Sequence, residues 1–231
     1  MAKMNEHDAI FAKWVRCLDI IKKDVTSLSV SRHIFWAVQE MIEANRKIQL
    51  ASTFYKWMGS AYGVYQSIGL RRQVDPRRGT ISFRALLEEI ARQPAVISRK
   101  RYVALYRNPV HREEVADQHF DKFAGVGQPH VNRAMVKEDR DQLIRKIEGM
   151  KDYVDTRIAH YDPQRGPTSL PTYGDLDDCL DLVEALLIKY LAVLRAEAHL
   201  DILPTWQYDW KQIFRHPWIP PTEANEKEDH P

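Results

Sequence analysis

The chain has 231 residues, of which 44% are hydrophobic and 29% charged, and its formal net charge is +2. This composition excludes a wholly disordered chain, and the length fits one large domain with appendages. The small net charge conceals an uneven distribution. Residues 71–112 carry 11 basic and 3 acidic side chains, whereas residues 113–231 carry 14 basic and 23 acidic side chains. The local balances of +8 and −9 therefore say more about possible partners than the average does.

Apolar residues recur at helical spacing through most of the chain, and glycine is scarce, with 9 residues. Serine residues precede several of these periodic stretches and are expected to cap the helices. In chain order, the predicted helices cover about residues 5–24, a segment capped by Ser29 or Ser31, about 48–74, short segments capped by Ser82 and Ser98, 110–124, about 137–160, and a last long segment that begins at Asp175.

Two glycines lie four residues apart inside the predicted helix over 48–74. Each costs about 1 kcal/mol relative to alanine in an exposed helix, so Gly59 and Gly63 on one face need a compensating contact. We interpret the pair as a place where another helix, or the same helix of a second subunit, approaches closely.

No segment alternates as a β-strand does, so the predicted class is all-α, a helical bundle with additional short helices. Residues 1–202 form the predicted helical domain. Residues 203–231 form a Trp- and Pro-rich C-terminal extension, which we expect to lie across the bundle and bury its aromatic side chains. Its polar end, residues 222–231, is expected to be frayed.

The cysteines and the hydropathy pattern bear on the cellular compartment. Cys17 and Cys179 are far apart in apolar-periodic stretches, so both are expected to be free thiols in a reducing compartment. Charges interrupt the N-terminal sequence, unlike a signal peptide, and no run of 18 apolar residues predicts a membrane span. We expect a cytoplasmic protein without a membrane partner. Neither a nucleotide-binding glycine loop nor a metal-ligand pattern occurs, so no cofactor or metal is predicted.

The basic stretch over residues 71–112, the cationic segment, is the strongest electrostatic feature. Arginine presents a planar fork suited to phosphate, and Tyr102 and Tyr106 can stack on unpaired bases, so the segment is a candidate nucleic-acid interface. The alternative is a solvated face that complements the acidic residues 113–231, within or between subunits, and the charge pattern leaves both open. The candidate nucleic-acid-binding residues are Arg71, Arg72, Arg77, Arg78, Arg99, Lys100 and Arg101.

The sequence DTRIAHYD at residues 155–162 combines groups suited to phosphate chemistry. Arg157 and His160 are three residues apart and are therefore neighbours on one helix face. Histidine exchanges a proton near neutral pH, and arginine can hold a phosphate. The alternative interpretation is that both side chains stabilise the C-terminal end of a helix.

This motif, with the Pro-rich loop after it and the Leu-rich helix from Asp175, resembles the HEPN superfamily. Within the superfamily, the sequence is most similar to the abortive-infection U-type HEPN-like family of bacteria. The similar stretches are IFWAVQEMI at 34–42, FYKWMGSAYGVYQSIGLRRQVD at 54–75 and ISFRALLEEI at 81–90. The likeness covers about residues 30–200.

The resemblance implies a HEPN-like helical domain that commonly forms a homodimer, in a toxin–antitoxin or phage-defence system. Active superfamily members are metal-independent endoribonucleases, with a histidine for acid–base chemistry at the ribose 2′-hydroxyl and an arginine at the scissile phosphate. The residues carried over are His160 as the general base, Arg157 as the phosphate-binding residue and Asp155 as the residue that orients one of them. The implied partners are RNA and an antitoxin protein.

The sequence departs from the family pattern at the arginine. Four to six residues separate arginine from histidine in the family's motif, and Tyr153, Val154 and Asp155 occupy the matching positions here. A catalytically inactive HEPN-like interaction module or dimerisation scaffold is therefore the alternative function. A small-nucleotide binder without chemistry is a third.

Overall fold

The computed structural model describes residues 5–106, 112–158 and 171–218. These residues fold as an all-α bundle in which no β-strand occurs, with one isolated bridge between Ser98 and His130. The elements are α1 (Glu6–Ala44), η1 (Arg46–Ile48), α2 (Thr53–Gln73), α3 (Phe83–Arg92), η2 (Pro94–Val96), α4 (Arg99–Leu105), α5 (Arg112–Ala124), α6 (Arg133–Tyr153), η3 (Val154–Ile158), α7 (Tyr173–Arg195) and η4 (Trp210–Arg215).

The first helix, α1, is continuous over 39 residues, so the prediction of two separate helices in this part of the chain is wrong. Ser29 or Ser31 was expected to cap a second helix, but both lie inside α1. The Ser29 hydroxyl donates to the carbonyl of Val25, 2.9 Å away, and also contacts Glu184 of α7. A serine that bonds the carbonyl four residues earlier is satisfied without ending the helix.

Serine and threonine caps set the beginnings of α2, α3, α4 and α7. Ser82 and Ser98 cap α3 and α4, as predicted. The helix expected from residue 48 begins later, after a cap at Ser52. Thr172 and Asp175 form a reciprocal capping box, so α7 begins at Tyr173, before the expected start at Asp175.

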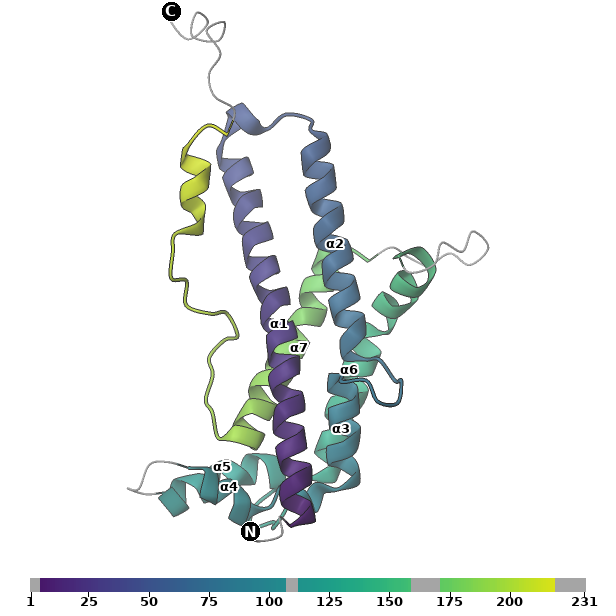
Figure 1. Ribbon diagram of the computed structural model, residues 1–231, viewed down its shortest axis with the longest axis vertical. Coiled ribbons are helices and arrows are strands. Elements are labelled where there is room, and N and C mark those ends of the chain that lie inside the picture. The colour runs from purple at the N-terminus through teal and green to yellow at the C-terminus, as the bar shows by residue number, and fades with distance from the viewer. Residues whose placement is uncertain (1–4, 107–111, 159–170, 219–231) are drawn as a thin grey trace, which may run out of the picture.

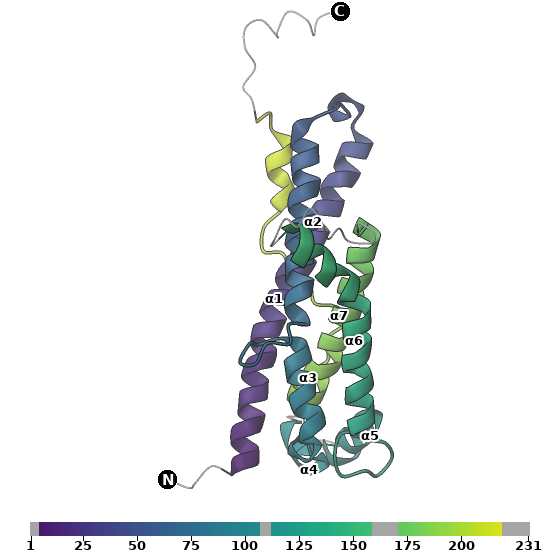
Figure 2. The ribbon, with the colours of Figure 1, turned by 90° about the vertical axis from the view of Figure 1, so that its right-hand side faces the viewer.

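The long helices α1 and α2 form an antiparallel hairpin, and α7 crosses behind it (Figure 1). Figure 2 shows α6 and α7 on one side of this hairpin, α3 below α2 and in line with it, and α4 and α5 at the end of the bundle that holds the N-terminus. One apolar core joins these helices. Its largest fully buried side chains include Trp14, Leu18, Phe83, Leu87, Phe120, Leu143, Ile147 and Tyr190.

The close approach predicted for the glycine pair is made by a side chain of α7. A Cβ atom at Gly59 would collide with the hydroxyl of Tyr173, and one at Gly63 would lie 3.7 Å from the same ring. Tyr173 also packs edge-on against Phe35 and Tyr62, whose rings stack with centroids 4.0 Å apart. The small residues of α2 thus make room for the beginning of α7.

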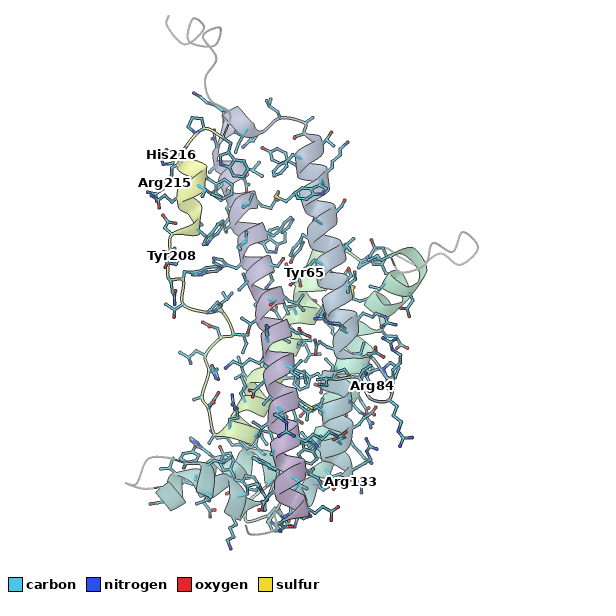
Figure 3. The ribbon with its side chains drawn as sticks, in the orientation of Figure 1. Tyr65, Arg84, Arg133, Tyr208, Arg215 and His216 are labelled. Carbon is cyan, nitrogen blue, oxygen red and sulfur yellow. The ribbon has the colours of Figure 1, made fainter. Side chains whose placement is uncertain are left out.

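The described part of the C-terminal extension, residues 203–218, runs along the outside of α1, as predicted (Figure 1). The ring of Trp206 lies 5.4 Å from that of His33, centroid to centroid. The expectation that the extension buries its aromatic side chains is wrong, because Tyr208 is 83% and Trp218 64% exposed. Figure 3 shows Tyr208 on the outer side of the extension. Residues 222–231, expected to be frayed, lie outside the described residues.

Among the helices that the structure describes, none has the length and apolar character needed to cross a membrane.

Candidate functional site

The DTRIAHYD motif begins where α6 passes into η3, a five-residue π-helical turn. Such turns are rare and occur frequently at functional sites. Asp155 lies in η3 with a described side chain, whereas only the backbone of Arg157 is described. His160 and the rest of the motif lie outside the described residues, as does the loop over residues 159–170. The structure therefore places one of the three candidate catalytic side chains.

Asp155 is held by an arginine from a different helix. The Nε atom of Arg71, near the end of α2, donates to Asp155 Oδ1 at 2.7 Å. About a quarter of the Arg71 side chain and a third of the Asp155 side chain remain exposed, so the pair lies at the edge of the bundle. A guanidinium thus lies beside the motif, although the motif itself lacks the arginine that the resemblance implies.

Arg71 also belongs to a small network at the end of α2. Its Nη1 lies 3.8 Å from Asp75 Oδ2, while Arg77 donates to Asp75 from its backbone N–H and from its guanidinium. Asp75 is almost fully buried, and its carbonyl accepts a bond from the Ser82 hydroxyl. The hydrogen bonds from Arg77, with the nearby charge of Arg71, lower the pKa of Asp75. This network fixes the turn that connects α2 to α3.

Two further candidate arginines pair with α1. Arg72 Nη2 lies 2.8 Å from Asp24, and Arg101 Nη2 lies 2.7 Å from Asp8. The Arg101 guanidinium also lies over the ring of Phe11, 4.8 Å from its centroid. These two side chains connect α2 and α4 to α1.

Arg99 has the most contacts of the candidate arginines. It donates to the carbonyl of Gln128 at 3.0 Å, pairs with Asp121 and Asp117 of α5, and lies over the ring of Phe120. Only 18% of its side chain is exposed, so Arg99 stabilises the α4–α5 end of the bundle.

The last two candidates, Arg78 and Lys100, line separate hollows. Arg78 lies with Arg77 in a hollow of about 490 Å³ between the 75–82 turn, α1 and α3. Lys100 lines another, of about 860 Å³, beside His130. The cationic segment is thus divided between the end of α2 with its turn and the α4 end of the bundle, which lie apart in Figure 1.

A polar cluster between α1, α2 and α7 was missed from the sequence. Arg32 bonds Asp181 at 2.6 Å and Glu184 at 2.8 Å, while the Tyr62 hydroxyl and the Trp36 indole both donate to Asp177 at 2.8 Å. Burial, with the bond to Asp177, raises the pKa of Tyr62. The available signal was the spacing of the three acidic residues of α7, which share one face of the helix.

Two features bear on metal and thiol chemistry in the described residues, the potential metal ligands and the two cysteines. No group of three or more His, Cys, Asp or Glu side chains suited to a metal ion occurs within the described ranges. Cys17 and Cys179 are both free thiols, and burial raises the pKa of Cys179 to about 11. A thiol with such a pKa stays protonated near neutral pH.

The fold and these contacts define an all-α helical bundle with an arginine–aspartate pair at the end of α6. No family model, no curated protein and no solved structure matches the chain.

Proposed function

We propose that the protein is a HEPN-like member of a bacterial defence or toxin-type system, which binds RNA at the end of α6 and cleaves it without a metal ion. The observation that carries the proposal is the ion pair between Arg71 and Asp155. It brings a guanidinium to a motif that lacks the expected arginine. A homodimer and an antitoxin partner belong to the same proposal.

The role of Arg71 follows from charge. An unpaired carboxylate at residue 155 would repel an RNA phosphate, whereas a carboxylate bonded to a guanidinium is largely compensated. Arg71 therefore lowers the electrostatic cost of a phosphate beside η3. Arg157 adds a second positive charge to the same short segment.

His160 supplies the proton chemistry in this proposal. As a general base it takes the proton of a ribose 2′-hydroxyl, and the 2′-oxygen attacks the adjacent phosphorus. The bond from phosphorus to the 5′-oxygen breaks, and the 5′-oxygen takes up a proton. The products are a 2′,3′-cyclic phosphate and a free 5′-hydroxyl, with no metal, oxidant or reductant required.

The test is an RNA-cleavage assay of the wild type and His160→Ala, at low and at physiological salt. We expect cleavage by the wild type and its loss in the variant. His199→Ala is the matched control, because His199 is partly exposed and contacts Glu197 at 3.2 Å, after the end of α7. Background RNA breakdown that is equal in the wild type and His160→Ala would exclude the enzyme.

A catalytically inactive interaction module is the second candidate function. The observation that favours it is that arginines of the cationic segment pair with acidic residues of the second half of the chain, as Arg71 does with Asp155 and Arg99 with Asp117. Salt titration separates the two functions. Loss of bound RNA with added salt supports RNA binding, whereas RNA-independent loss of a dimer or protein partner supports the module.

A further inference from the structure

The helices α1 and α2 form a broad apolar face on the side of the hairpin away from α7. Two adjoining hollows, of about 530 and 620 Å³, lie along it. We call this surface the hairpin face. Its main apolar residues are Val30, Ile34 and Val38 of α1 and Trp57, Tyr65 and Ile68 of α2. In Figures 1 and 2, no element among the described residues lies over it.

Large side chains of α2 project from this face. Trp57 is 63%, Tyr65 47% and Ile68 40% exposed, and Phe54 of the same helix is 50% exposed. Figure 3 shows Tyr65 beside the space between α1 and α2. Contiguous apolar exposure of this kind is uncommon on monomers and marks an interaction site.

The charges of the hairpin face determine what it can bind. The charged residues that line the two hollows are Asp24 and Arg72, and these pair with each other at 2.8 Å. Because this lining, within the described part of the chain, offers no cation besides Arg72, phosphate binding has no basis here. The lining is suited to contact with an uncharged apolar surface.

We propose that the occupant is a second copy of the chain, bound across a two-fold axis. Ala61 lies between Trp57 and Tyr65, at a spacing of four residues from each, so a small side chain is flanked by two large exposed rings. If two α2 helices lie antiparallel with Ala61 at the axis, Trp57 of each copy meets Tyr65 of the other. The face is therefore complementary to itself, as a two-fold interface requires.

The size of the face is adequate for such a dimer. Residues 57–72 of α2 extend over about 24 Å, and two adjacent helices are about 20 Å wide, which gives a flat area on the order of 500 Å². The projecting rings raise the accessible area toward the roughly 800 Å² per partner of a standard interface. The apolar face and its size together fit a stable homodimer.

This inference assigns a surface to the homodimer of the proposed function, and it does not depend on RNA. The two proposals can fail separately. A monomer that still binds RNA would contradict the dimer surface alone, whereas a dimer that does not bind RNA would contradict the RNA site alone. The hairpin face lies on the side of α1 and α2 away from α7, whereas η3 packs against α6 and α2.

The first experiment measures molecular mass by sedimentation equilibrium at tens of micromolar protein. We expect twice the chain mass of 27.0 kDa for the wild type, and at least a hundredfold weaker association for the double variant Trp57→Glu/Tyr65→Glu. Tyr208→Glu/Trp218→Glu is the matched control, because it replaces a tyrosine and a tryptophan of the C-terminal extension that are at least as exposed as Tyr65 and Trp57, and it should remain dimeric. A monomeric wild type would overturn the proposal, also if another part of its own chain covers the face. Association of the double variant as strong as that of the wild type would overturn it too.

A cross-linking experiment tests the proposal even if the double variant fails to fold. Ala61→Cys places two thiols near the proposed axis, so mild oxidation should yield a disulfide-linked dimer on a non-reducing gel. The wild type under the same oxidant controls for Cys17 and Cys179, and Tyr208→Cys controls for random collision. Cross-linking of Ala61→Cys at only the rate of Tyr208→Cys would contradict the two-fold arrangement.

Discussion

At the scale of single residues, the ion pair between Arg71 and Asp155 places opposite charges side by side at the end of α6. The two residues are 84 positions apart in sequence, and their side chains meet at 2.7 Å. The sequence showed that the motif lacks the arginine implied by the resemblance, whereas the guanidinium beside the motif comes from the packing of α2 against η3. A long-range pair of this kind leaves no local pattern that could be found in advance.

We predict that Arg71→Ala weakens RNA binding by at least tenfold, because the positive charge that lies beside Asp155 and the proposed phosphate position is then lost. The free energy of unfolding should fall by about 1 kcal/mol or less, since both partners are partly exposed. Fluorescence anisotropy with labelled RNA and urea denaturation measure the two effects. The double variant Arg71→Ala/Asp155→Asn should recover part of the lost affinity.

Arg84→Ala provides the matched control for this prediction. Arg84 is similarly exposed and forms its own ion pair, with Glu88 on α3 at 2.8 Å. Its removal should change RNA affinity by less than twofold. Equal losses for the Arg71 and Arg84 variants would indicate a general charge effect and contradict a site at η3.

The glycine pair gives a second prediction at this scale. Gly59→Ala should gain less stability than Gly63→Ala, because only the new methyl group at Gly59 collides with the Tyr173 hydroxyl. Gly63→Ala should gain up to about 1 kcal/mol from helix propensity. In a Tyr173→Phe background, which removes that hydroxyl, the two gains should converge. Thermal or urea unfolding measures this cycle, and a Gly59 penalty that persists in the Tyr173→Phe background would assign the strain to another neighbour.

At the scale of elements, the sequence predicted helices better than it predicted their ends. The caps at Ser82 and Ser98 were recognised because the residues after them are periodic and apolar. The prediction of a cap at Ser29 is wrong. A serine inside a helix that bonds the carbonyl four residues earlier cannot be distinguished by sequence from a serine at an N-cap. The predicted start of α7 at Asp175 is too late. An aspartate before a periodic apolar stretch is typical of an N-cap residue, whereas Asp175 lies inside α7 and forms a capping box with the N-cap residue Thr172.

The turn between α2 and α3 gives a prediction on pH. The pKa of Asp75 is lowered in the folded state by bonds from Arg77, so its contribution to stability is present above the unfolded pKa of about 3.8 and is lost as the pH falls through the lower folded value. Asp75→Asn should therefore be destabilising at pH 7, and the difference should shrink below pH 4. Urea denaturation between pH 7 and pH 2 measures it. A difference that does not change with pH would show that the carboxylate charge is not involved.

At the scale of the whole molecule, the uneven charge distribution acquires a structural meaning. Arg99 joins α4 to α5, and Arg101 and Arg72 join their helices to α1, so much of the cationic segment stabilises the bundle. Arg71 differs because its pair lies beside the motif. The helical periodicity predicted the all-α class correctly. The sequence could not separate cations that stabilise the bundle from those available to a ligand, because that depends on which acidic residue folding brings near each.

The C-terminal extension and the hairpin face show the same limit for apolar residues. Trp57 and Tyr65 have the helical spacing of core residues, yet both are largely exposed. Aromatic residues of the extension likewise remain at the surface, as Tyr208 does. Periodicity indicates which side chains share a face, but it does not indicate whether the neighbour of that face belongs to the same chain.

The most direct test of the RNA site is photo-cross-linking of the full chain to single-stranded RNA that contains 4-thiouridine, followed by mass spectrometry of the linked peptides. The Arg71–Asp155 pair predicts adducts in the peptides that contain residues 71–78 and 153–162. Adducts confined to other regions, such as the hairpin face around Trp57 and Tyr65, or no adducts at all, would contradict an RNA site at the end of α6.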